Sequence, residues 1–129
     1  RSFKTSGERH RNGIELMILL RFKEGTIVKQ LDTALFPGLI MLCGIMERLL
    51  DINEIWITSV QDGKHKSQSL HNAGRAVDIR SKIYPPEKVQ EIVSEFKAFY
   101  DAEYDLIWES QGKPWEHMHL EYDPGNKSY

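Results

Sequence analysis

Two short segments of this chain, residues 69–78 and 115–119, are crowded with histidine and carboxylate side chains, and this crowding constrains the fold more than any other feature. Four of the five histidines lie in these segments or close to them. A site built from both segments requires a fold that brings Asp78 and His119 together. Two imidazoles and one carboxylate hold a zinc ion and leave its fourth position for water. The pattern therefore predicts a zinc site with a base beside it.

Length and charge limit the possible classes of protein. The 129 residues, 40% of them apolar, fit one domain with one core. We expect a polar tail over residues 1–13 and a single zinc peptidase-like domain over residues 14–129. The 17 basic and 19 acidic residues nearly cancel. Nothing therefore favours binding to nucleic acid or to an anionic membrane surface, and we expect a monomer.

Neither a secretion signal nor a membrane span is expected. The polar stretch 1–13 lacks the apolar segment of a signal peptide, which leaves the localisation open. The longest apolar run, over residues 39–46, is closed by Glu47 and Arg48 and is too short to span a bilayer. The same run contains the single cysteine, Cys43, which predicts a buried thiol and excludes an internal disulfide.

Hydrophobic patterning predicts an α+β fold. Residues 14–22 form either a strand, which we favour, or a short buried helix. The apolar residues 39–50, which follow Pro37, predict a helix buried on all sides in the centre of the fold, and a second helix begins at Pro85–Pro86. Strands joined by short loops usually pair antiparallel, so we expect a small, mostly antiparallel sheet with helices on one face. The remaining strands are predicted over residues 54–60, 76–79, 104–109 and 117–122.

Spacing shows how the metal ligands come together. His71 and Asp78 are too far apart for one helix face, so a turn must fold the chain between them, and Gly74 can supply it. His117 and His119 alternate on a strand and share one face, so either can complete a tetrahedral site. We favour His119 as the ligand because a glutamate stands three residues before it.

That glutamate is Glu116, the first candidate for the base that accepts a proton from water and returns it to the leaving amine. In an ideal strand Glu116 faces away from His119, so this assignment requires an irregular backbone near Pro114 and Trp115. Glu109 is the alternative base. The sequence does not decide between them, because the distance from each carboxylate to the water decides the role.

Each of these residues also has an ordinary structural explanation. Asp78 can cap a turn, His117 and His119 can be surface histidines, and Glu116 can be a solvated charge. Taken together, a His-x6-Asp pair and a Glu-x2-His pair in one small domain favour a site over coincidence. His65 lies on a glycine-containing loop, where a solvated residue and a site residue are equally plausible.

These motifs resemble the zinc D-alanyl-D-alanine carboxypeptidase family, which includes D-Ala-D-Ala dipeptidases and phage endolysin peptidases. The motifs resemble still more closely those of the hedgehog amino-terminal signalling domain, which shares the fold of that family. The resemblance covers roughly residues 54–123. It is carried by Ser69, His71, Gly74, Ala76, Asp78, Glu116 and His119, together with the segments 62–65, 104–110 and 117–119.

The resemblance implies the hedgehog and carboxypeptidase-like fold, with the zinc site at the sheet. It implies that Zn²⁺ is held by His71, Asp78 and His119. It also implies that Glu116, or Glu109 by its match to the hedgehog acid, is the catalytic base.

By the same resemblance, His65 and His117 are polar neighbours of the reacting carbonyl that stabilise the oxyanion. One departure concerns specificity. The peptidases commonly carry an arginine in the loop after the strand that here reads 57–62, and neither Gln61 nor Asp62 replaces it. A fixed guanidinium suits a free terminal carboxylate, so its absence shifts the expectation from carboxypeptidase toward endopeptidase activity.

The sequence thus predicts a zinc metallopeptidase that hydrolyses short peptides, with peptidoglycan stem peptides as the substrate implied by the resemblance. Two alternatives stay open. In the first, the zinc is structural and the domain is a hedgehog-like binding module without turnover. In the second, the same ligands hold iron for oxygen chemistry.

Overall fold

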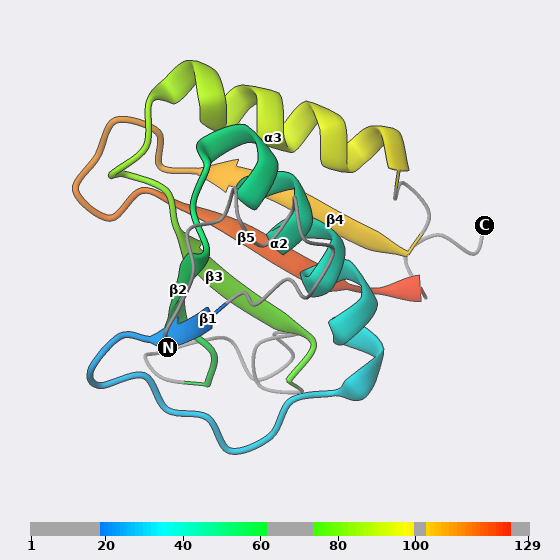
Figure 1. Ribbon diagram of the computed structural model, residues 1–129. Coiled ribbons are helices and arrows are strands. Elements are labelled where there is room, and N and C mark those ends of the chain that lie inside the picture. The colour runs from blue at the N-terminus through cyan, green and yellow to red at the C-terminus, as the bar shows by residue number, and fades with distance from the viewer. Residues whose placement is uncertain (1–18, 62–73, 100–102, 125–129) are drawn as a thin grey trace, which may run out of the picture.

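The computed structural model describes residues 19–61, 74–99 and 103–124, which form a five-stranded sheet with two α-helices on one side (Figure 1). The α+β class is therefore confirmed. In chain order the elements are β1 (Leu19–Phe22), the 3-10 helix η1 (Thr33–Leu35), α2 (Phe36–Leu50), β2 (Glu54–Ser59), β3 (Ala76–Arg80), α3 (Pro86–Phe99), β4 (Tyr104–Glu109) and β5 (His117–Tyr122).

The sheet is mixed, with the strand order β1-β2-β3-β5-β4. Strand β2 pairs antiparallel with β3, β3 with β5, and β5 with β4. The short loop between β4 and β5 predicts only the last of these pairings. The edge strand β1 instead pairs parallel with β2. Three of the four pairings are antiparallel, so the prediction of a mostly antiparallel sheet is confirmed.

Helix α2 begins and ends as its sequence predicts, with proline in its first turn and a left-handed Asp51 (φ 54°) after its last residue. It is not buried on all sides, because the side chain of Ile40 is 69% exposed. Gly38 lets the ring of Tyr104 approach closely, and the Tyr104 hydroxyl donates a hydrogen bond of 2.6 Å to the carbonyl of Ala34. These contacts fix α2 against β4.

By length and composition alone, the segment Thr33–Leu50 could cross a membrane, because its 18 residues have a mean hydropathy of 1.5. This segment is longer than the apolar run over residues 39–46. It also includes η1, the first turn of α2 and residues 47–50. In the fold, 44% of it is buried inside the protein. The core helix of a globular domain passes the same test.

The buried side chains form one hydrophobic cluster between the helices and the sheet. Helix α3 contributes Val89, Ile92, Val93 and Phe96 to it at helical spacing. Cys43 lies in the same cluster, and burial raises the pKa of its thiol to about 12. The prediction of a buried, unreactive thiol is therefore confirmed. The sheet residues in the cluster are Ile55, Ile57, Val77, Ile79, Tyr104, Leu106, Met118 and Leu120.

Candidate functional site

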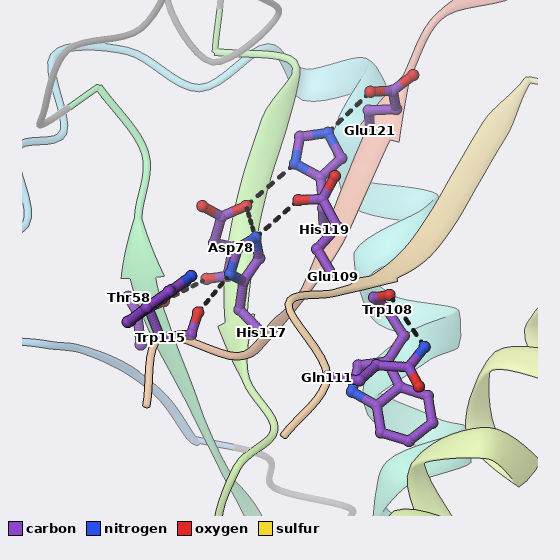
Figure 2. A network of polar contacts seen from close by, with 9 residues as sticks. All are labelled: Thr58, Asp78, Trp108, Glu109, Gln111, Trp115, His117, His119 and Glu121. Atoms are coloured by element: carbon purple, nitrogen blue, oxygen red, sulfur yellow. Dashed lines mark hydrogen bonds and ion pairs between the residues drawn. The ribbon is translucent and has the colours of Figure 1, made fainter. Parts of the chain in front are cut away.

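Alternation along the central strands divides the sheet into an apolar face toward the helices and a polar face on the other side. In the β3–β5 pairing, Asp78 lies opposite His119 and Arg80 lies opposite His117. Glu109 of β4 also lies opposite His117. Successive side chains of a strand point to opposite faces, so these five residues share the polar face. Figure 2 shows four of them, Asp78, Glu109, His117 and His119.

The first group of polar contacts on this face is centred on His119. Its Nδ1 lies 3.0 Å from Asp78 Oδ1, and its Nε2 lies 2.8 Å from Glu121 Oε1 (Figure 2). Burial disfavours a charged ring, but the hydrogen bonds and negative charges of Asp78 and Glu121 outweigh burial and raise the pKa of His119 to about 10. Without a metal, this imidazole therefore carries a proton on both nitrogens at neutral pH.

Asp78 and His119 fit two ligands of one zinc ion. Ligand atoms of a tetrahedral zinc with bonds near 2.0–2.1 Å are separated by roughly 3.3 Å. The observed 3.0 Å between Asp78 Oδ1 and His119 Nδ1 is close to that separation. Glu121 would then accept the proton of Nε2 and leave Nδ1 as the ligand, a common arrangement around zinc-bound histidines.

The third predicted ligand, His71, lies outside the described residues, as does His65. Within residues 19–61, 74–99 and 103–124, no group of three or more His, Cys, Asp or Glu side chains is arranged to hold a metal ion. The structure thus brings together two of the three predicted ligands.

A second group of contacts links His117 to Glu109. His117 Nε2 lies 2.8 Å from Glu109 Oε1, and His117 Nδ1 lies 2.9 Å from the carbonyl oxygen of Trp115. Both partners are hydrogen-bond acceptors, and which ring nitrogen of His117 donates depends on the tautomer of the imidazole. His117 Nε2 is also 3.7 Å from Asp78 Oδ1, which joins the two groups of contacts.

Glu116, the favoured candidate for the base, lies away from Asp78 and His119. Its Oε2 accepts hydrogen bonds from Ser81 Oγ (2.8 Å) and Trp108 Nε1 (2.9 Å), and its Oε1 accepts one from the backbone N–H of Gly112 (3.0 Å). Burial raises the pKa of Glu116, but these three hydrogen bonds outweigh burial and hold it below its usual value. Ser81 is fully buried, so the carboxylate points to the apolar side of the sheet rather than toward His119.

The irregular backbone expected near Pro114 and Trp115 is present as a turn, and the irregular stretch begins earlier, at Ser110. Ser110 has a φ of 56° and Gly112 a φ of 83°. This turn directs Glu116 to the apolar side instead of the polar side, so the structure brings Glu109 to the predicted ligands and does not bring Glu116 there.

Glu121, the second acid beside His119, is not among the residues predicted from the sequence. A signal for it is present, because His117, His119 and Glu121 alternate along β5 and must share a face.

Gly74 and Gln61 fix the two ends of the chain segment that carries His71. Gly74 has a φ of 73°, and a Cβ there would lie 2.6 Å from the carbonyl oxygen of Gln30, so glycine is required as predicted. The side-chain amide of Gln61 bonds to the backbone N–H of Lys29 (2.6 Å) and to the carbonyl of Gln30 (2.7 Å). Gln61 thus has a structural role in the loop where the peptidases carry an arginine.

Comparison with family models, with curated proteins and with solved structures finds no match to this chain. The resemblance to the carboxypeptidase and hedgehog families therefore depends on the motifs in the sequence.

Proposed function

We propose that this chain is a zinc-dependent peptidase that hydrolyses short peptides, with peptidoglycan stem peptides as its substrates. The observation that carries the proposal is the meeting of Asp78 and His119 at 3.0 Å beside the hydrogen-bonded pair His117–Glu109. Two metal ligands and a proton-transferring pair on one sheet face are the parts that metal-assisted hydrolysis requires.

The metal would be held by Asp78 and His119 together with His71. When bound, a zinc ion of this kind lowers the pKa of water in its open position to near neutrality and polarises the carbonyl under attack. Glu121 keeps His119 in the orientation that exposes Nδ1.

Glu109 is the proposed base. Its side chain is 45% exposed, so a water molecule reaches it, and its Oε1 lies 2.8 Å from His117 Nε2. Glu109 accepts the proton of the attacking water and returns it to the leaving amine. The ring of His117, whose Nε2 lies 3.7 Å from Asp78 Oδ1, is placed to donate a hydrogen bond to the negative charge that develops on the carbonyl oxygen.

The test combines metal analysis with kinetics on peptides that contain D-amino acids. We expect about one zinc per chain in the parent and in every variant. Glu109→Gln should lower kcat/KM by at least about 100-fold, because it removes the proton acceptor. Glu116→Gln should retain most of the activity, and Glu91→Gln on the exposed side of α3 serves as the matched control.

Two results would contradict the proposal in different ways. If Glu116→Gln loses activity and Glu109→Gln does not, the base is Glu116 and the structure of the turn before β5 changes on binding. If the zinc-loaded parent cleaves no peptide, the function is not hydrolysis, and a zinc-stabilised binding module takes its place.

A further inference from the structure

A pocket of about 290 Å³ adjoins the candidate site where β3 ends and β5 begins. His117 belongs to both the site and the pocket, and Arg80, opposite His117 in the sheet, lines the pocket from β3. A ligand group held in this pocket therefore lies directly beside the proposed reacting carbonyl.

The charge of the pocket is strongly positive. Lys23, Arg80 and Lys82 line it, and the structure shows no ion pair for any of them among the residues it describes. The one carboxylate in the described lining is that of Glu116. Its oxygens accept hydrogen bonds from Ser81, Trp108 and Gly112, and it also interacts electrostatically with Lys82, so one carboxylate offsets only part of the charge of the three cations.

Two further features suit the pocket to a ligand. The guanidinium of Arg80 lies 4.8 Å from the ring centroid of Trp56, a cation–π contact that restricts its position. Ile83 and Trp115, each 63% exposed, add apolar surface beside the cations. A rigid guanidinium with flexible ammonium groups around it matches a carboxylate next to an apolar side chain.

We propose that this pocket binds a carboxylate group of the peptide substrate, close to the bond that is cleaved. The inference rests on the proposed function for the identity of the ligand as a peptide. The carboxylate can be the free C-terminus or an acidic side chain, and both present the same chemistry to Arg80, Lys23 and Lys82.

The experiment measures binding, by calorimetry, of three probes to the zinc-loaded protein. The probes are N-acetyl-D-alanyl-D-alanine, its C-terminal amide, and an amidated N-acetyl dipeptide with one glutamate side chain. Loss of a charge-assisted contact typically weakens binding by about tenfold or more, so at least one carboxylate probe should bind about tenfold more tightly than the uncharged amide. The carboxylate probe that binds more tightly identifies the source of the group.

Variants show whether the pocket is the binding site. Lys82→Gln and Arg80→Gln should each weaken the preferred carboxylate probe by about tenfold and leave the uncharged amide unchanged. Lys82 is exposed, so Lys82→Gln should fold normally. If Arg80→Gln does not fold, Arg80→Lys replaces it, because it keeps the positive charge and removes only the guanidinium. Lys88→Gln on α3 is the matched control, because Lys88 does not line the pocket.

Equal binding of all three probes would overturn the inference. A carboxylate preference that is unchanged in both Lys82→Gln and Arg80→Gln would also overturn the inference. The carboxylate would then bind to the zinc ion rather than to the pocket. Failure of the proposed function is a different result from failure of this inference. It would appear as a lack of peptide cleavage in the kinetic assay, which the binding experiment does not measure. If the protein cleaves peptides but shows no carboxylate preference, the proposed function stands and only the proposed role of this pocket is wrong.

Discussion

The carboxylate of Glu116 ties the turn before β5 to the sheet through three hydrogen bonds, from Ser81, Trp108 and Gly112. In Glu116→Gln, the new NH2 group faces at least one of these donors. We therefore expect the free energy of unfolding at neutral pH to fall by about 1–3 kcal/mol. Urea denaturation of the parent and the variant measures this loss.

The same group predicts a pH dependence. The folded-state pKa of Glu116 is lowered from its usual 4.5, so its contribution to stability is present above that pH and is lost as the pH falls through the folded-state value. The difference in stability between the parent and Glu116→Gln should therefore shrink below about pH 4.5. A difference that stays constant down to acid pH would contradict this account, and Glu91→Gln provides the control.

Glu121 is expected to act on zinc through His119. Its Oε1, 2.8 Å from Nε2, holds the ring so that Nδ1 faces Asp78. Glu121→Ala should weaken zinc binding by about 10- to 100-fold while leaving all three ligands in place. Competition with a chromogenic chelator measures the affinity, and Glu103→Ala, at an exposed position before β4, is the control. Unchanged affinity would exclude this positioning role.

At the scale of single residues, alternation predicted more of the site than motif matching did. It placed His117 and His119 on one face, and it also indicated that Glu116 faces the other way. The motif favoured Glu116 because the spacing Glu-x2-His is shared with peptidases. Which carboxylate reaches the site depends on the turn at Ser110 and Gly112, whose direction no local pattern in the sequence reveals.

Among the elements, the corner at Gly74 connects the segment of His71 to β3. Gly74→Ala adds a Cβ both at a φ of 73° and 2.6 Å from the backbone of Gln30, which cannot move freely. Gly112→Ala has similar strain at a φ of 83° but no neighbour within 4 Å. We expect Gly112→Ala to cost about 1–2 kcal/mol of stability, and Gly74→Ala to cost more because a steric clash is added. Thermal unfolding of both variants tests this order, and equal losses would contradict it.

Most elements could be predicted from the sequence. Strands β4 and β5 have the predicted bounds, and α3 begins at the predicted proline pair. The parallel pairing of β1 could not be predicted, because its partner β2 lies beyond helix α2 and the alternation of side chains is the same for both directions. The exposed side of α2 was missed because Ile40 is apolar and yet faces outward.

For the whole molecule, a bound zinc would connect strands β3 and β5 with the segment that carries His71. A ligand that binds only the folded state adds about 2.7 kcal/mol of stability when its free concentration is a hundred times Kd. Chelation should therefore lower the Tm of the parent and leave that of His119→Ala unchanged. If the Tm of the parent changes neither when zinc is added nor when a chelator is added, no zinc is bound. A lowered Tm in a protein that never cleaves peptides would favour the binding module.

The sheet separates its tasks by face, with apolar side chains from β3, β4 and β5 toward the helices and Asp78, Glu109, His117 and His119 on the other side. Residues that form the core and residues of the proposed site therefore alternate along the same strands without sharing positions. A combinatorial library at the polar-face positions alone should yield mostly well-folded members. Such a scaffold can acquire new specificities, or lose its reaction and become a pure receptor, without rebuilding its interior.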